Sequence, residues 1–423
     1  MYDHSVTVVT IGNRPEGRND VTLSSLSAMT PVSRALNSND ASPSTRTRLL
    51  FVDNLRWTMI LLVLSMHAAD TYSPLGNWYF VDRKTIGVFT LFFFAVWQMY
   101  LQSFFMGLLF FLAGYFVPGS YDWKGATRFI RERGFRLGLP VLFYMFVLGP
   151  ITEYFCAHSW NSTEPTSFAN EWIKHIRNGE FLQENGPLWF CLALLIFAVV
   201  YAAWRVYGPG SGRGGESREA PGSEMLAGFA LGMAVFTFAM RLIFPSGYSF
   251  LNMHLGDFPQ YILLFGAGIL MARNDWLPKL SFARGMGWLL VVLPVGFAAW
   301  ITLLWAGGMV KGNGKAYSGG WHWQAAGMNV WEAFTCVAIC YGLLVIYRKS
   351  YNEQGRLERF LSDNAFSVYV FHPPILILLA RLLHPVSWPV LVKFVVLWVL
   401  SAICSFALSA AVFRRIPLLR KIL

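Results

Sequence analysis

The chain is dominated by long apolar stretches, which are too many and too long for the core of a soluble domain. Ten runs approach the roughly 20 residues that a helix needs to cross a hydrocarbon core about 30 Å thick. They lie at residues 49–68, 88–117, 137–155, 187–207, 225–244, 258–272, 286–306, 327–347, 365–383 and 389–413. The sequence therefore predicts an all-α, polytopic membrane protein with about ten transmembrane helices. The run at 258–272 is short, as in a broken or re-entrant segment.

Only 13% of the residues are charged, and the net charge is +11. If the N-terminus is inside, nearly all Lys and Arg residues fall on one side of the predicted spans. The opposite side keeps only Arg83, Lys84, Lys174, Arg177, Lys311 and Lys315. This asymmetry is the positive-inside pattern of membrane proteins. It predicts cytoplasmic N- and C-termini, a location in the cell membrane, the lipid bilayer as a partner, and no nucleic-acid partner.

Two segments lack the apolar residues of the spans. Residues 1–48 are rich in Ser, Thr and Asn, and we expect a disordered cytoplasmic tail there. Residues 208–223 are rich in Gly and Ser and predict a flexible cytoplasmic linker inside the membrane domain, 49–423. The five cysteines form no Cys-x-x-Cys pair and show no zinc-ligand spacing with histidine, so no metal site is expected.

Arg56 and His67 are two ionisable residues inside the first apolar run. Burying charge in a bilayer is costly, so such residues usually face the protein interior and have a function. Eleven helical steps return to nearly the same face and cover about 16 Å along the axis. The spacing therefore places both side chains on one helix face, each near a different membrane surface.

Several segments resemble, in order, the motifs of the integral-membrane acyltransferase 3 family. They are the basic residue and histidine at 56 and 67, Phe-Phe-Leu-Ala-Gly-Tyr at 110–115, Arg-Gly-Phe-Arg at 133–136, Pro-Leu-Trp-Phe at 187–190, Gln-Tyr-Ile-Leu-Leu-Phe-Gly-Ala-Gly at 260–268, and Ser-Val-Tyr-Val-Phe-His-Pro at 367–373. The similarity extends from about residue 49 to the C-terminus. The branch of the family that succinylates periplasmic glucans is particularly similar.

The resemblance implies a catalytic role for the first helix. Near pH 7 a histidine can take a proton from a hydroxyl group, and His67 is expected to be this general base. Asp70 could orient the imidazole or be an interfacial carboxylate. In the family the residue at the position of Arg56 faces the route of the acyl donor, which implies donor binding; a structural ion pair with Asp53 is the alternative.

Four arginines stand within nine residues: Arg128, Arg131, Arg133 and Arg136. A cytoplasmic cluster of this density suits the phosphate groups of acyl-CoA, because guanidinium groups bind phosphate oxygens bidentately. The alternative is that these residues only anchor the topology. No phosphate loop or dinucleotide glycine motif indicates another nucleotide site, and no permanently bound cofactor is expected.

Further residues are candidates for substrate binding. His372 precedes Pro373 and Pro374, which leave backbone carbonyl groups without helical partners. The histidine could bind substrate or satisfy that backbone. Glu332 lies in the eighth predicted span, where it could steer an acceptor hydroxyl. Trp321 and Trp323 could stack on a sugar or belong to an interfacial aromatic belt.

Together these features predict an O-acyltransferase that moves an acyl group from cytosolic acyl-CoA to a hydroxyl of an extracytoplasmic carbohydrate or glycolipid. The alternative is a transporter or flippase, in which Arg56 and His67 line a substrate route. Against it, no repeated pair of broken helices is evident. The sequence does not specify the acyl group, the acceptor or the oligomeric state.

Overall fold

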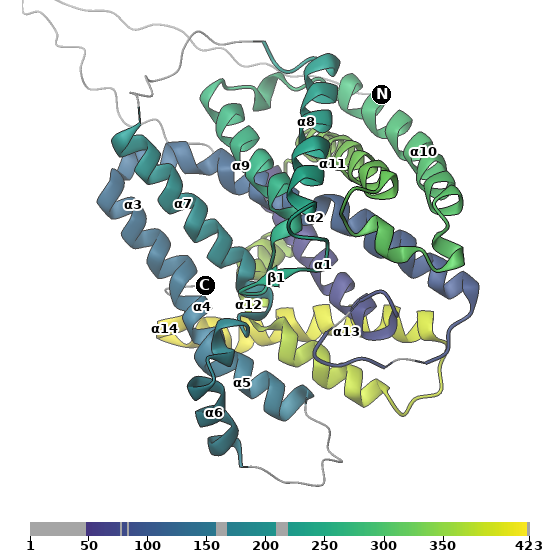
Figure 1. The fold of residues 1–423 in the computed structure, drawn as a ribbon. Coiled ribbons are helices and arrows are strands. Elements are labelled where there is room, and N and C mark those ends of the chain that lie inside the picture. The colour runs from purple at the N-terminus through teal and green to yellow at the C-terminus, as the bar shows by residue number, and fades with distance from the viewer. Residues whose placement is uncertain (1–47, 77, 83, 158–166, 209–218, 421–423) are drawn as a thin grey trace, which may run out of the picture. The chain divides into compact units, whose positions relative to one another are not determined.

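The computed structural model describes residues 48–76, 78–82, 84–157, 167–208 and 219–420. The predicted tail, except Arg48, and residues 209–218 of the predicted linker lie outside these ranges. The described residues are mainly helical (Figure 1). One short hairpin pairs β1 (Ser249–Phe250) with β2 (Met253–His254) in antiparallel register. The expectation of an all-α fold is confirmed.

The helices follow one another along the chain. They are α1 (Leu50–Tyr72), α2 (Val88–Lys124), α3 (Ala126–Arg133), α4 (Leu139–Phe143), α5 (Gly149–Ile151), α6 (Phe168–Arg177), α7 (Trp189–Tyr207), α8 (Ser223–Arg241), α9 (Phe258–Arg273), α10 (Phe282–Ala306), α11 (Trp323–Ser350), α12 (Arg356–Leu383), α13 (Val390–Ala411) and α14 (Pro417–Arg420). Wider π-helical turns join α3, α4 and α5 into one helical stretch, Ala126–Phe155.

In the described part of the chain, nine helical stretches are long and apolar enough to cross a membrane. They correspond to the second to tenth predicted spans, so the chain is a polytopic membrane protein. The predicted span at 258–272 is an unbroken helix, α9. The first predicted span forms α1, which carries Asp53, Arg56, His67 and Asp70 and does not belong to these nine. At 23 residues, α1 is nevertheless about 34 Å long.

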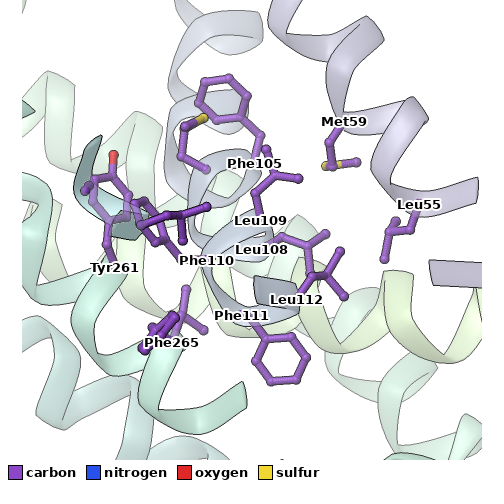
Figure 2. Close-up of a cluster of buried hydrophobic side chains, with 14 of the residues drawn as sticks. Leu55, Met59, Phe105, Leu108, Leu109, Phe110, Phe111, Leu112, Tyr261 and Phe265 are labelled. Atoms are coloured by element: carbon purple, nitrogen blue, oxygen red, sulfur yellow. The ribbon is translucent and has the colours of Figure 1, made fainter. Parts of the chain in front are cut away.

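Two glycines allow α2 and α9 to pack with their backbones close together. A Cβ atom on Gly114 would lie 2.1 Å from the carbonyl oxygen of Phe265, and one on Gly268 would lie 2.1 Å from that of Phe111. Small residues permit such close approach between membrane helices. Figure 2 shows the surrounding core, in which α2 side chains lie between Tyr261 of α9 and Leu55 of α1.

The first helix is held from several sides, although it carries two acidic side chains, an arginine and a histidine. It contacts α2, α11, α12 and α13. The indole of Trp398 in α13 donates a hydrogen bond to the carbonyl oxygen of Leu61 at 2.9 Å. In α1, Leu55, Val63 and Leu64 are buried. This packing fixes the rotation of α1, and hence the direction of its ionisable side chains.

Candidate active site

The last turn of α1 holds His67 and Asp70 together. His67 Nδ1 lies 3.2 Å from Asp70 Oδ2, and only 18% of the His67 side chain is exposed. An ionised carboxylate only accepts hydrogen bonds, so Nδ1 carries the proton in this pair. The neutral imidazole then has an unprotonated Nε2, which can accept a proton from a substrate. The structure thus brings the predicted base and its predicted orienting carboxylate together.

A glutamine from α2 completes the surroundings of Asp70. Gln98 Nε2 donates a hydrogen bond to Asp70 Oδ1 at 2.8 Å, and Gln98 is buried. The two oxygens of Asp70 therefore have different partners, His67 and Gln98. No sequence motif indicated Gln98, because it lies 28 residues from Asp70 inside an apolar helix.

Aromatic rings cover His67. Trp78 stacks on it, with ring centroids 3.7 Å apart and planes 18° apart. His372 lies nearly parallel, its ring centroid 5.4 Å from that of His67. Stacking restricts the imidazole to one plane, so the direction of Nε2 is fixed as well. The structure therefore places the predicted substrate-binding His372 beside the predicted base.

The structure also shows how the carbonyl group left without a helical donor by Pro373 is satisfied. His372, in α12, is fully buried. Its Nδ1 lies 2.9 Å from the carbonyl oxygen of Tyr369. Pro373 has no N–H group to donate to that carbonyl, so the histidine side chain supplies the missing donor. With Nδ1–H used in this way, Nε2 is a hydrogen-bond acceptor, and it has no partner in the described part of the chain.

The loop that carries Trp78 is tightly constrained. A Cβ atom on Gly76 would lie 2.1 Å from Asp70 Oδ1, so the loop can pass the site only with glycine there. Further along, Asp82 pairs with Lys393 of α13 at 2.7 Å. The exposed fraction is 3% for Asp82 and 0% for Lys393. A buried ion pair thus anchors the loop to α13.

Arg56 lies near the other end of α1. Its guanidinium group is 3.3 Å from Asp53 and lies over the ring of Phe116, 4.8 Å from the centroid. It is 40% exposed. Arg133 is close enough to Arg56 and Arg136 for their positive charges to repel one another. The structure thus groups Arg56 with two of the four arginines predicted to bind the donor.

The other two arginines of the cluster, Arg128 and Arg131, are exposed. Arg128 donates to Glu132 at 2.9 Å and lies over the ring of Trp123. Glu132 also pairs with Lys124, so two cations share one carboxylate there. Arg131 is exposed on the same helix, α3. Of the predicted cluster, Arg133 and Arg136 are therefore the members whose charge adds to that of Arg56.

Glu332 belongs to a separate buried cluster. Arg241, which is 4% exposed, donates to Glu332 Oε2 at 2.8 Å and to Asp257 Oδ1 at 2.7 Å. Asn329 accepts a further hydrogen bond from Arg241. A small pocket adjoins these side chains, and its lining residues are Met233, Thr237, Arg241, Asp257, Gln260, Asn329, Glu332 and Ala333.

Two buried donors of this cluster, Arg241 Nε and Asn329 Nδ2, lack a hydrogen-bond partner in the described part of the chain. One cation and two carboxylates leave the cluster with one net negative charge. No sequence pattern indicates Arg241 or Asp257 as site residues, since each stands near the end of a predicted span, where charged residues are common.

The two predicted tryptophans lie at the surface near this cluster. Trp321 is 85% exposed and Trp323 is 56% exposed. The ring of Trp321 packs edge-on against Phe238 of α8, with centroids 5.7 Å apart. Neither is part of the buried pocket.

Glu184 lies outside the membrane-spanning stretches, in the loop before α7. Burial, followed by the charge of Glu153, raises the pKa of Glu184 to about 8. Burial, followed by the charge of Glu184, raises the pKa of Tyr79. Tyr79 packs edge-on against Trp78, with ring centroids 5.1 Å apart. This acidic pair therefore lies close to the aromatic cover of His67.

No group of three or more His, Cys, Asp or Glu side chains is arranged as metal ligands within the described residues. The acidic and histidine side chains near His67 are instead engaged with each other, with Gln98 or with the backbone. The arrangement suits proton transfer by an imidazole that is oriented by a carboxylate.

Comparison with known proteins identifies the family. An acyltransferase domain model, that of the acyltransferase 3 family, matches residues 49–414. No curated protein and no solved structure is detectably similar to the chain. The match includes α1 and its His67–Asp70 pair and ends nine residues before the C-terminal end of the predicted membrane domain. The chain therefore belongs to the acyltransferase 3 family and is a membrane acyltransferase.

Proposed function

We propose that this acyltransferase takes an acyl group from cytosolic acyl-CoA and places it on a hydroxyl of an extracytoplasmic carbohydrate or glycolipid. The observation that carries the proposal is the arrangement along α1. His67, oriented by Asp70, lies at one end of this helix. Arg56, accompanied by Arg133 and Arg136, lies at the other. Arg56 and His67 are about 16 Å apart along this one helix, and a pantetheine arm can span that distance.

In the proposed reaction, His67 Nε2 removes the proton from the acceptor hydroxyl. The oxygen attacks the carbonyl carbon of the thioester, a new C–O ester bond forms, and the C–S bond to coenzyme A breaks. The leaving thiolate takes up the proton from the imidazolium. Asp70 favours the imidazolium and keeps Nε2 directed at the substrate, because it accepts the hydrogen bond from Nδ1.

The proposed donor site is the basic end of α1. Coenzyme A carries several phosphate charges, and Arg56, Arg133 and Arg136 provide positive charge there, although Arg56 is paired with Asp53. Arg128 and Arg131 extend this surface outward, although Arg128 shares Glu132 with Lys124. An acyl-CoA bound there would direct its thioester between the helices towards His67.

The proposed acceptor contacts lie around His67 and in the Arg241 pocket. His372 offers an unpaired Nε2 to a hydroxyl donor. Glu332 is bound to Arg241, so it is better suited to hold a hydroxyl than to remove a proton. Unpaired donors and carboxylate acceptors in one pocket match a hydroxyl group, which both donates and accepts. Trp321 and Trp323 would offer ring faces to a sugar.

The resemblance to the branch that succinylates periplasmic glucans leads us to propose a glucan or related glycolipid as acceptor and succinyl as one possible acyl group. Acetyl is the smaller alternative. Radiolabelled acetyl-CoA and succinyl-CoA, offered separately, distinguish the two by which label appears in the product.

The experiment that tests the function uses purified full-length protein, labelled acyl-CoA and a glucan acceptor. Free CoA and labelled acceptor are expected together. His67→Ala should lower turnover by about 10²- to 10⁴-fold, the usual contribution of a general base. His254→Ala, in the β2 hairpin, is the matched histidine control. Normal turnover in a folded His67→Ala variant would exclude His67 as the base.

A further inference from the structure

Asp70 is held by two hydrogen bonds, only one of which comes from the predicted base. Gln98 Nε2 donates to Asp70 Oδ1 at 2.8 Å, and His67 Nδ1 lies 3.2 Å from Asp70 Oδ2. Asp70 is 8% exposed and Gln98 is 3% exposed. The carboxylate plane is therefore defined by one partner from α1 and one from α2.

Gln98 is unusual for its position. It lies in α2, a strongly apolar helix, and its Oε1 atom is buried without a partner in the described part of the chain. Leaving a buried amide oxygen unpaired costs free energy. An apolar side chain of similar length would pack at this position without that cost. The hydrogen bond to Asp70 is the contact that such an apolar side chain could not make.

We propose that Gln98 is a positioning residue for acyl transfer, which acts on the base through Asp70. The amide N–H of Gln98 donates a hydrogen bond to the Asp70 carboxylate and holds it in place. The carboxylate in turn holds the imidazole of His67. An ionised carboxylate that accepts a hydrogen bond at only one oxygen can rotate about the Cβ–Cγ bond. When both oxygens accept hydrogen bonds, this rotation is blocked. Loss of the amide therefore releases Asp70, and the imidazole loses its fixed tautomer and direction. This inference rests on the proposed role of His67.

The same helix offers a matched comparison one turn further on. Gln102 Nε2 donates to Asp257 Oδ2 at 3.3 Å. Positions four apart lie on the same face of a helix, about 6 Å along its axis. Two glutamines of α2 thus hold two different carboxylates: Asp70 behind the base and Asp257 beside Arg241. Replacing either removes one amide from the same face, but only Gln98 contacts Asp70.

The test is a double-mutant cycle in the purified full-length protein, with turnover of labelled acyl-CoA as the readout. Gln98→Met keeps the side-chain length and removes the amide. We expect it to lower kcat by about 10- to 100-fold with less than a twofold change in KM for acyl-CoA. In an Asp70→Asn background the same substitution should lower kcat by less than about threefold, since coupled residues are not additive.

Gln102→Met is the control for the cycle. Its effect, whatever its size, should be the same in the Asp70→Asn background as in the unmodified protein, because it does not act through Asp70. If the Gln98→Met effect is equally additive with Asp70→Asn, Gln98 acts through packing only and the proposal is wrong. If Gln98→Met does not fold, Gln98→Leu, which also removes the amide donor, carries the same expectation.

A second readout needs no turnover. Diethyl pyrocarbonate modifies unprotonated imidazole, and the rate at His67 can be followed by peptide mass spectrometry, with exposed His322 as the internal reference. We expect Gln98→Met to slow the reaction of His67 at least threefold and to have no further effect after Asp70→Asn. An unchanged rate would overturn the proposal. Normal turnover in His67→Ala would instead overturn the proposed function, so the two failures are distinguishable.

Discussion

His67 and His372 lie nearly face to face, with ring planes 14° apart, and each uses its Nδ1 for a fixed partner. His67 Nδ1 faces Asp70, whereas His372 Nδ1 faces the carbonyl oxygen of Tyr369. Both rings therefore present Nε2 as an acceptor. Only His67 is backed by a carboxylate, which stabilises the imidazolium formed when a base takes up a proton. This difference supports the proposal that His67 is the base and that His372 only forms hydrogen bonds.

The assignment makes a prediction about the relative cost of losing each histidine. His372→Leu should lower kcat/KM by about 10-fold, the value of one hydrogen bond, mainly by raising KM for the acceptor. Loss of His67 should cost far more. Steady-state kinetics with varied acceptor measure both. If His372→Leu is as damaging as His67→Ala at saturating acceptor, His372 takes part in proton transfer.

A second prediction concerns the donor. Arg133→Gln together with Arg136→Gln removes two charged donors near Arg56 and should weaken acyl-CoA binding by about 10- to 100-fold. Acceptor KM should stay within about twofold. Arg414→Gln with Arg415→Gln is the matched control, since it removes the same charge from the C-terminal segment. Equal weakening by both pairs would mean that only the overall positive charge matters.

Much of the fold follows from the sequence, because helices that cross a membrane must satisfy their backbone groups internally and need long apolar runs. The runs at 88–117 and 327–347 accordingly lie within α2 and α11. The spacing of Arg56 and His67 likewise predicted one helix with a basic and an imidazole end, and α1 is continuous across both. Local periodicity determines these features.

Contacts between distant segments could not be predicted in this way. The Asp82–Lys393 pair joins residues 311 positions apart, and the Arg241–Glu332 pair joins residues 91 apart. Hydropathy indicates which residues are in the membrane, but not which faces meet. Hydropathy therefore indicates no partner for Glu332, whereas the structure binds it to Arg241.

The Asp82–Lys393 pair leads to a stability prediction. His384 Nδ1 also lies 3.0 Å from Asp82 Oδ1, so Lys393→Met leaves the buried carboxylate with His384 as its remaining side-chain partner. The loss should destabilise the protein by up to about 3–5 kcal/mol, the usual cost of breaking a buried pair. Thermal unfolding in detergent should show a lower Tm. Adding Asp82→Asn should recover part of the loss, because the buried charge that lost Lys393 is removed. A double variant no more stable than Lys393→Met would argue against this buried charge as the cause.

The acidic loop predicts how stability depends on pH. The folded pKa of Glu184 is about 8, above its ordinary value of 4.5, so the folded state holds this proton more tightly than the unfolded state. Its stabilising contribution is complete below about pH 4.5 and is lost as the pH rises through 8. Glu184→Gln should therefore flatten the fall in Tm between pH 6 and pH 9. Glu224→Gln, at an exposed site, should keep the original slope, and an unchanged slope in Glu184→Gln would exclude Glu184 as its source.

The last prediction joins topology to mechanism. A donor linked to coenzyme A does not cross a bilayer unaided, so the basic end of α1 must face the cytosol if Arg133 and Arg136 receive it. Leu75 is exposed in the loop after His67, and Thr127 is exposed beside the arginine cluster. In a cysteine-free variant expressed in intact cells, Leu75→Cys should react with an impermeant thiol reagent, whereas Thr127→Cys should react only after permeabilisation. If both cysteines react from the outside, the basic end and the His67 end of α1 lie on the same side of the membrane. The proposed transfer across the bilayer would then be wrong.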